Sequence, residues 1–309
     1  MWRVLLLPVF LFGFELHPGW NLLGAKLDFN ATFFQRVEIA WKYENEWKCS
    51  KYISGFAKIE RVKAGEGFWI YSDKEAVFAP YLERGLSWYW QLQGEVDENR
   101  SANVYDIDLF DSSKELIERL HQKKKVVICY FSAGSYEDWR SDKDRFPDEV
   151  LGRPLDGWEG ERWLDIRSPV VREIMKDRLE LARQKSCDGV EADNVDAYTN
   201  ESGFNLSASD QLSYNRFLAS EAHKRGLLIG LKNDLEQIPQ LVEYFDFAIN
   251  EQCFEFNECE RYLPFLVRNK AVFNAEYMQM PDCKKSKLYG ISAAFYNEEL
   301  DGNLYRSCF

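Results

Sequence analysis

A short acidic stretch, residues 188–196, holds the side chains best suited to chemistry in this 309-residue chain. It reads D-G-V-E-A-D-N-V-D and so carries four carboxylates and one Asn within nine residues. Successive side chains of a strand point to opposite faces, which places Glu191 and Asp193 on the same face. Unpaired carboxylates are costly inside a sheet covered on both sides, so they indicate a strand end that opens into a polar site. The alternative is a solvated acidic loop after a helix.

Paired carboxylates favour glycoside hydrolysis. One must hold a proton for the leaving oxygen while the other is ionised, and crowding of acids raises the pKa of one of them. Two other chemistries remain open: a carboxylate-bound Mg²⁺ or Ca²⁺ site, and a binding site without turnover that holds a cationic polymer. Only three His occur, and they form no H-x-H or H-x-x-x-H pair, so a zinc site or a His triad is not expected. We expect neither a resident metal nor a cofactor.

The elements that must position these groups alternate between apolar and amphipathic segments. Strands are expected at residues 88–92, 104–110, 126–131, 189–193, 228–232, 247–251, 272–276 and 289–295. Helices are expected at 112–124, 168–185, 207–225, 235–244 and 258–269, several of them opened by a capping Ser. This order predicts an α/β fold, a (β/α)8 TIM barrel over residues 80–309. An open doubly wound sheet is the alternative, but no G-x-G-x-x-G follows a strand to support it.

Polar residues close most of the expected strands. They are Asp106, Asp108, Tyr130, Glu191, Asp193, Asn194, Lys232, Asn233, Asp234, Asn250, Glu251, Asn274 and Glu276. Reactive groups of such barrels lie at the C-terminal ends of the strands, and randomly placed charges would not favour one end. We therefore expect an acidic catalytic site there, with the long insertion at residues 132–167 as a wall of it.

The N-terminal part of the chain has a different texture. Residues 17–79 contain short β-prone runs broken by Gly, Asn and Ser, which predicts a small β module of about five strands. Its Trp20, Trp41, Trp47 and Trp69 could stack on sugars, but we expect most of them to fill a small core. Residues 1–16 resemble a secretory signal, so we expect a secreted or periplasmic protein. No other stretch approaches the roughly 20 apolar residues of a membrane span.

Charge and cysteines narrow the partners and the compartment. The net charge of −12 without a basic stripe argues against a nucleic-acid partner and favours a cationic ligand. Seven Cys occur without a CxxC pair, and their connectivity stays open. Cys253 and Cys259 could close a small loop, Cys283 and Cys308 could pair with each other or with Cys49, and Cys129 and Cys187 are expected as buried free thiols.

Several runs resemble glycoside hydrolase family 114. They are W-Y-W-Q-L-Q-G at 88–94, V-Y-D-I-D-L-F-D at 104–111, the segment 127–140, L-G-R-P-L-D-G-W at 151–158, W-L-D-I-R at 163–167, the segment 187–198, G-L-K-N-D at 230–234 and N-E-Q-C-F at 250–254. The resemblance runs in order from about Trp88 to Tyr277 and does not cover residues 1–80.

The resemblance implies an endo-α-1,4-polygalactosaminidase with a (β/α)8 barrel. The polysaccharide substrate would be galactosamine-rich and cationic where it is deacetylated. The family's E-P-D-N run matches residues 191–194, with Ala192 in place of Pro. By this match Asp193 and Glu251 are the catalytic pair of a retaining mechanism, Asp193 as nucleophile and Glu251 as acid/base, or the reverse. Substrate contacts would come from Asp106, Asp108, Tyr130, Glu191, Asn194, Lys232, Asn233 and Glu276. The pair Cys253 and Cys259 also matches a Cys pair of the family. Separately, we expect the protein to be a monomer.

Overall fold

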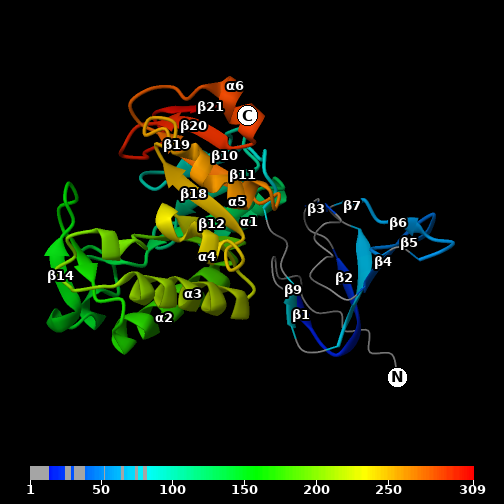
Figure 1. The fold of residues 1–309 in the computed structure, drawn as a ribbon, viewed down its shortest axis with the longest axis horizontal. Coiled ribbons are helices and arrows are strands. Elements are labelled where there is room, and N and C mark those ends of the chain that lie inside the picture. Colours follow the sequence, from blue (N-terminus) through cyan, green and yellow to red (C-terminus); the bar gives the residue numbers. More distant parts are fainter. Residues whose placement is uncertain are drawn as a thin grey trace. The chain divides into compact units, whose positions relative to one another are not determined.

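The computed structural model describes residues 14–24, 29–30, 39–51, 53–63, 66–73, 76–78 and 82–309. The chain divides into two compact units, the first ending at Tyr81 and the second formed by Leu82–Phe309 (Figure 1). Most of the expected signal segment, residues 1–13, lies outside the described residues, while residues 14–16 form a strand. No helix in the described ranges has the length and apolarity needed to cross a membrane.

The second unit is built on a nine-stranded sheet that curls into a barrel (Figure 1). In sheet order the strands are β10 (Trp88–Gln91), β11 (Val104–Asp108), β12 (Val126–Ser132), β16 (Gly189–Asp193), β17 (Leu228–Lys232), β18 (Phe247–Glu251), β19 (Val272–Glu276), β20 (Ser292–Tyr296) and β21 (Tyr305–Ser307). Neighbours from β10 to β20 pair in parallel, and only β21 is antiparallel. The predicted barrel is therefore confirmed, and β16 to β19 begin and end at the expected residues.

The barrel closes without a backbone ladder between its first and eighth parallel strands. Within residues 82–309, no strand pairing joins β10 to β20. Instead the Tyr296 hydroxyl accepts a hydrogen bond from the backbone N–H of Trp90 and donates one to the backbone carbonyl of Trp88, both at 3.1 Å. The Tyr305 hydroxyl, on β21, donates to the same carbonyl at 2.9 Å. Tyrosine side chains thus join the two strands at this seam.

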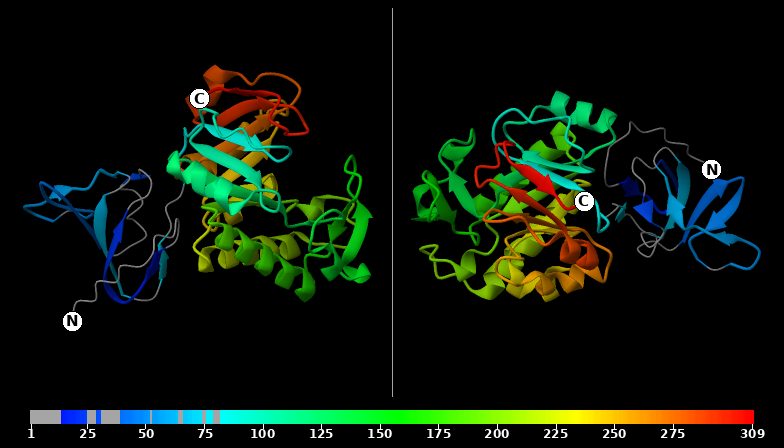
Figure 2. Two further views of the ribbon diagram at one scale, coloured as in Figure 1. Left: turned by 180° about the vertical axis from the view of Figure 1, so that it is seen from behind. Right: turned by 90° about the horizontal axis from the view of Figure 1, so that it is seen from above.

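Helices lie around the outside of these strands (Figure 2). They are α1 (Lys114–Gln122), α2 (Pro169–Lys185), α3 (Ala208–Lys224), α4 (Ile238–Leu241), α5 (Leu263–Leu266) and α6 (Cys283–Tyr289). Ser168 caps α2 and Ser207 caps α3, as predicted, whereas α1 is capped by Ser113 and not by Ser112. The long helices expected at 235–244 and 258–269 are wrong, since each is a 3₁₀ turn followed by one short helix with Pro in its first turn. The strand expected at residues 289–295 is β20, and it starts only at Ser292. Tyr289 instead ends α6, and Gly290 caps that helix with φ 76°.

The insertion between β12 and β16 forms its own small sheet. β13 (Ser135–Glu137), β15 (Glu161–Leu164) and β14 (Leu151–Pro154) pair in that order, all antiparallel. The N–H groups of Ala133 and Gly134 both donate to the Asp193 carbonyl, at 2.9 and 3.0 Å. A Cβ on Gly134 would overlap the Asn194 backbone, so glycine permits this crossing. The insertion is thereby anchored at the end of β16.

The first unit is a β structure, as predicted. Its five-stranded sheet has the order β2 (Gly19–Gly24), β8 (Gly67–Ser72), β4 (Ile39–Glu44), β5 (Glu46–Cys49), β6 (Ala57–Lys58). Two further pairs are β1 (Phe14–Leu16) with β9 (Ala76–Phe78) and β3 (Phe29–Asn30) with β7 (Arg61–Val62). Its fully buried residues include Ala40, Ile59, Val62, Phe68 and Ile70. None of the four tryptophans is buried, so the expectation that most of them fill this core is wrong.

Three disulfides hold the barrel unit. Cys253–Cys259 and Cys283–Cys308 form two of the pairs that the sequence left open, and Cys49 stays a buried free thiol. The expectation that Cys129 and Cys187 are free thiols is wrong, because they form the third disulfide. Cys129 lies on β12 and Cys187 lies two residues before β16, the strand that pairs with β12. Only the closed sheet brings these positions together across 58 residues of sequence.

Candidate active site

One buried ammonium group organises the carboxylates at the C-terminal ends of β16, β17 and β18. Lys232 Nζ lies 2.9 Å from Glu191 Oε1, 3.2 Å from Asp193 Oδ1 and 3.4 Å from Glu251 Oε2. It also lies 4.7 Å from the centre of the Trp90 ring, a cation–π contact. The Lys232 side chain is only 2% exposed, so these charges interact with little solvent screening.

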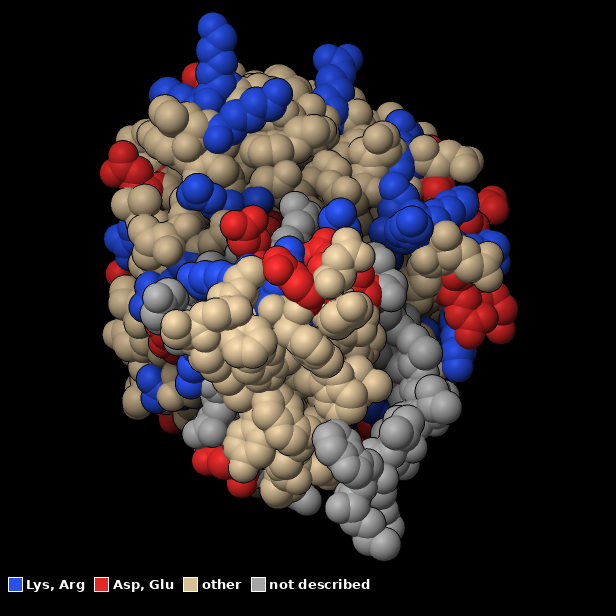
Figure 3. Space-filling model, turned by 90° about the vertical axis from the view of Figure 1, so that its right-hand side faces the viewer, with Lys and Arg blue, Asp and Glu red and all other residues tan. Residues whose placement is uncertain are grey.

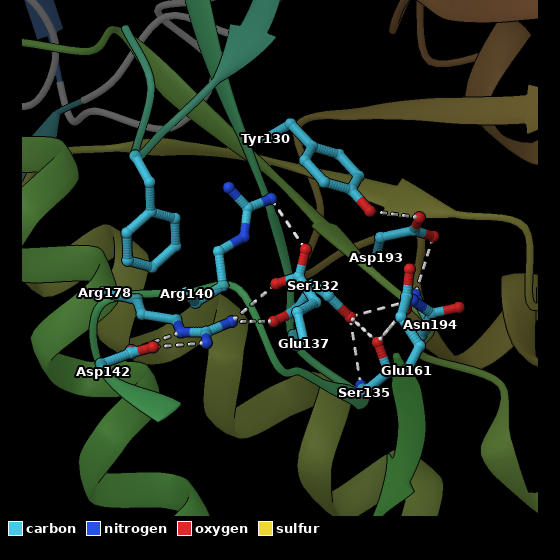
Figure 4. A network of polar contacts seen from close by, with 12 residues as sticks. Tyr130, Ser132, Ser135, Glu137, Arg140, Asp142, Glu161, Arg178, Asp193 and Asn194 are labelled. Atoms are coloured by element: carbon cyan, nitrogen blue, oxygen red, sulfur yellow. Dashed lines mark hydrogen bonds and ion pairs between the residues drawn. The ribbon is translucent and has the colours of Figure 1, made fainter. Parts of the chain in front are cut away.

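Asp193 is held in place by two further donors. The Tyr130 hydroxyl donates to its Oδ2 at 3.1 Å, and the Asn194 backbone N–H donates to its Oδ1 at 2.7 Å (Figure 4). Asn194 adopts a left-handed conformation, φ 59°, which turns this N–H back onto the preceding side chain. With Lys232, three donors converge on the Asp193 carboxylate and fix its position.

Glu251 has an equivalent set of donors from other elements. The Tyr277 hydroxyl donates to its Oε1 at 2.5 Å, and Asn233 Nδ2 donates to its Oε2 at 3.1 Å. Burial alone would raise the pKa of Glu251, but the Lys232 charge and these hydrogen bonds outweigh burial, and the pKa is lowered. Asn233, with φ 46°, also accepts from the Glu251 backbone N–H at 3.1 Å. The glutamate is therefore fixed at both its backbone and its side chain.

Glu191 and Asp106 form a buried acid pair beneath these two residues. Both side chains are fully buried. Burial raises the pKa of Glu191 to about 7 against the attraction of Lys232. Burial and the charge of Glu191 raise the pKa of Asp106 well above its usual value. Both Asp106 carboxyl oxygens and Glu191 Oε2 are buried without a hydrogen-bond partner among the described residues, which favours the protonated form of Asp106 next to the charged cluster.

Asp108, expected as a substrate contact, is instead saturated by protein groups. Its two carboxylate oxygens accept from Arg140 at 3.0 and 2.7 Å, and Oδ1 also accepts from the backbone N–H groups of Phe110 and Asp111. Arg140 lies 2.7 Å from Glu137 as well (Figure 4). Asp108 thus anchors the insertion to β11.

A second polar network links the insertion to Asn194 (Figure 4). Asn194 Nδ2 donates to Ser132 Oγ at 2.9 Å and to Ser135 Oγ at 3.2 Å. The Ser135 hydroxyl in turn donates to Glu161 Oε2 at 2.6 Å. Burial, partly offset by the Ser135 hydrogen bond, raises the pKa of Glu161 to about 7. Through Asn194, this network reaches the carboxylate of Asp193.

Glu276, predicted from the sequence as a substrate contact, does not contact the carboxylates around Lys232. It is 1% exposed and accepts from the Phe254 backbone N–H at 3.0 Å and from Asn274 Nδ2 at 2.8 Å. The next residue, Tyr277, points to Glu251 instead, because side chains alternate along a strand. Glu276 therefore supports the loop that contains the Cys253–Cys259 disulfide.

An acidic pocket lies along the loops that follow β16, β17 and β18. It has a volume of about 220 Å³ and is lined by Asp196, Tyr198, Thr199, Asp234, Leu235, Glu236, Glu258 and Arg261. Burial and the charge of Asp196 raise the pKa of Asp234 to about 8. Burial and the charge of Asp193 raise the pKa of Asp196 to about 6. Four acids and one guanidinium line the pocket, and Arg261 pairs with Glu236 at 2.7 Å.

Within the described ranges, no group of three or more His, Cys, Asp or Glu side chains has the arrangement of a metal site. The Lys232 ammonium already stands among the three carboxylates where a cation would be bound.

The sequence missed several residues of the site. Trp90, Arg140, Glu161 and Tyr277 all contact it, yet none was a candidate. Tyr277 had a signal, since it directly follows an expected strand and lies on the alternate face from Glu276. Arg140 and Glu161 come from the insertion, whose path the sequence pattern does not define.

Comparison with known proteins agrees with this geometry. The model of glycoside-hydrolase family GH114 matches residues 72–308. The crystal structure of Aspergillus fumigatus Ega3 in complex with galactosamine is similar at 41% sequence identity and a TM-score of 0.69, over 73% of this chain and 96% of that chain. The glycoside hydrolase domain of PelA from Pseudomonas aeruginosa has the same fold at 13% identity and a TM-score of 0.59, over 72% of this chain and 98% of that chain. A search of curated protein sequences found no match. The chain belongs to family GH114 and is a glycoside hydrolase.

Proposed function

We propose that this protein cleaves α-1,4-linked, galactosamine-containing polysaccharide within the chain, as an endo-α-1,4-polygalactosaminidase-like enzyme that retains anomeric configuration. One observation carries the proposal: Asp193 and Glu251, from two different strands, share the Lys232 ammonium and each holds a tyrosine hydroxyl. Two oriented carboxylates at the mouth of a barrel are the catalytic groups that glycoside hydrolysis requires. The similarity to Ega3, whose structure contains galactosamine, supports the choice of sugar.

The spacing of the two carboxylates supports retention. Lys232 Nζ is 3.2 Å from Asp193 and 3.4 Å from Glu251, so the two oxygens can be no farther apart than the sum of these distances. That limit falls at the short end of the ~6.5–9.5 Å typical of inverting pairs, and it includes the ~5–5.5 Å of retaining pairs.

We assign Asp193 as nucleophile and Glu251 as acid/base, with the reverse as the alternative. Asp193 is the less exposed of the two, 18% against 31%, and three donors hold it in place, which suits a nucleophile that must be aimed at the anomeric carbon. Glu251 is the more accessible to a leaving oxygen and to water. Its lowered pKa in the free enzyme is the observation that favours the reverse assignment, because an acid must first gain a proton.

The acidic pocket supports a cationic, deacetylated polymer. Galactosamine carries an ammonium group, and Asp196, Asp234, Glu236 and Glu258 line the pocket with only Arg261 to balance them. A bound ammonium would favour the ionised forms of Asp196 and Asp234, whose pKa values are raised by burial and by neighbouring carboxylates. N-acetylation removes that charge, so we expect faster turnover of deacetylated chains.

Export to the periplasm or the cell exterior is part of the proposal. Three disulfides hold the barrel unit, and such bonds persist in oxidising compartments. The signal-like segment at residues 1–16 agrees with that placement.

The decisive test measures new reducing ends from a deacetylated α-1,4-galactosamine polymer, from a chitosan-type polymer and from a neutral polymer. We expect Asp193→Asn and Glu251→Gln each to lose at least about a thousandfold in kcat on the first polymer. Asp177→Asn, a substitution at a surface residue paired with Arg145, should keep wild-type activity. Polymer retention without new reducing ends would instead indicate a non-catalytic binding barrel, and loss of activity with a chelator would indicate a metal-dependent hydrolase.

Kinetics on a substrate with a good leaving group distinguish the nucleophile from the acid/base. An aryl galactosaminide needs little help from an acid, so the acid/base variant should recover its first step and the nucleophile variant should not. Azide should rescue Glu251→Gln with retention of configuration if Glu251 is the acid/base. Rescue of the Asp193 variant with inversion would agree with Asp193 as nucleophile, and the opposite pattern would establish the reverse assignment.

A further inference from the structure

We propose that one face of the N-terminal five-stranded sheet is a second binding site for the polysaccharide, separate from the catalytic cluster. The occupant is a stretch of amino-sugar polymer, and this identification rests on the proposed function. We call this surface the aromatic face. By the strand register, its residues are Trp20, Leu22, Ile39, Trp41, Tyr43, Trp47, Trp69, Tyr71 and the buried Cys49.

The two faces of this sheet differ sharply in burial. On the opposite face, Ala40, Phe68 and Ile70 are fully buried and form the core of the unit. On the aromatic face, Trp20 and Trp47 are 47% and 46% exposed, and the remaining aromatic rings are half-buried or exposed. Two rows of large rings at the surface cost free energy unless a ligand covers them.

Figure 3 shows a broad area of uncharged side chains below the centre of the view, with acidic side chains above it and at its lower left. By the strand register, Glu44 and Glu46, at the turn between β4 and β5, lie on the opposite face, and Glu44 pairs with Lys42 and Lys48. The aromatic face therefore presents rings, and rings suit a sugar chain that bears ammonium groups because they stack on the pyranose C–H face and attract cations.

The rings are arranged before any ligand binds. Trp20 meets Tyr71 edge to face, with ring centres 5.4 Å apart. Trp47 meets Trp41 at 6.4 Å and Tyr43 at 5.5 Å, also edge to face. Such contacts fix the ring planes, so little conformational freedom is lost on binding.

The tryptophans also carry indole N–H groups that can donate hydrogen bonds. None of the indole N–H groups of Trp20, Trp41, Trp47 and Trp69 donates to a residue that the structure describes. A pyranose ring offers an apolar C–H face for stacking and hydroxyl oxygens as acceptors at its edge. The combination of an open ring face and a free donor fits a sugar better than it fits a purely apolar protein surface.

The unit lies outside most of the region that defines the hydrolase. The family model begins at residue 72, whereas the aromatic face lies between residues 20 and 71. A polymer held by this face stays tethered to the catalytic unit through the chain, which raises its effective concentration there. The gain applies to long chains alone, because a short oligosaccharide cannot occupy both sites.

The test uses the full chain with Trp20→Ala/Trp47→Ala, and Tyr244→Ala as the matched control at an exposed ring of the barrel unit. Mobility in gels that contain deacetylated galactosamine polymer reports binding without turnover, and reducing-end release gives KM on long polymer and kcat/KM on a short oligosaccharide. We expect the double variant to lose gel retardation and to raise KM on polymer about tenfold, with kcat/KM on the oligosaccharide unchanged. Tyr244→Ala should behave as wild type in all three measurements.

Several outcomes would overturn the inference. Unchanged retardation of the double variant would do so, and so would an equal loss on polymer and oligosaccharide. If the wild type is a dimer in solution and the double variant a monomer, the face is an interface between copies. Should the double variant fail to fold, the single variants Trp20→Phe and Trp47→Phe keep the ring and lose the N–H, and weaker gel retardation is then the required result. Because binding is read without turnover, failure of the catalytic proposal and failure of this one are distinguishable.

Discussion

Replacing Lys232 with Met tests whether one ammonium group sets the ionisation of the catalytic carboxylates. Met has nearly the same length and no charge, so the substitution leaves Glu191, Asp193 and Glu251 without their shared cation. At an effective dielectric constant of about 20, an ion pair at such distances is worth about 5 kcal/mol. Solvent reaches Glu251, whose side chain is 31% exposed, and reduces this effect.

We expect the loss of Lys232 to raise the pKa of whichever carboxylate must be ionised by at least about one unit. The sign follows from the contact: an ammonium stabilises the ionised form, so its removal favours the protonated form. The acidic limb of the plot of kcat/KM against pH should therefore shift to higher pH by that amount. Activity near pH 5 should fall by at least about tenfold more than activity near pH 8.

The assay is reducing-end release from deacetylated polymer between pH 4 and pH 9, with Lys185→Met as the control. Lys185 Nζ donates only to backbone carbonyls, those of Leu109, Phe110 and Ser112, so its loss should leave the pH profile in place. A Lys232→Met enzyme whose acidic limb coincides with that of the wild type would refute the reasoning, even if its activity were low throughout.

Three further changes give separable outcomes. Tyr130→Phe removes a donor to Asp193 and should lower kcat/KM about ten- to a hundredfold in reducing-end assays, with unchanged thermal stability; a wild-type rate would contradict this role. The pKa of Glu161, about 7 against 4.5 in the unfolded chain, means that the folded state binds the extra proton, so stability falls as pH rises from about 4.5 to 7. Glu161→Gln should flatten that fall in a series of Tm measurements, and an unchanged slope would exclude it as the cause. Replacing Cys129 and Cys187 with Ala should lower the free energy of unfolding by about 4 kcal/mol in urea titrations, because the disulfide spans 58 residues, and a loss below about 1 kcal/mol would show that it adds little.

The sequence predicted the strands of the barrel better than its helices. β16 to β19 are short apolar runs with polar ends, and burial on both faces makes such runs easy to recognise. The lengths of the helices α4 and α5 were predicted too long, because an amphipathic pattern does not show where a Pro starts a new helical turn.

The candidate site was predicted where strand ends determine it and missed where tertiary contacts do. Lys232 and Glu251 lie at strand ends and meet in one cluster, whereas Glu276, at the end of β19, binds the backbone of Phe254. Glu161 reaches the cluster only through the folded insertion, and the partner of Cys129 depends on which strands are neighbours. Such long-range proximity is absent from any local pattern of residues.

The tyrosine seam of the barrel has a consequence for how the enzyme opens. β10 and β20 are joined by the hydroxyls of Tyr296 and Tyr305, while β12, β16, β17 and β18 are joined to both neighbours by backbone ladders in the middle of the sheet. The edge strands of this sheet are β10 and β21, so their amide protons should exchange with solvent through local opening, and those of β16 and β17 only through global unfolding. The barrel can loosen at its seam while the strands that carry Asp193 and Lys232 stay paired to each other.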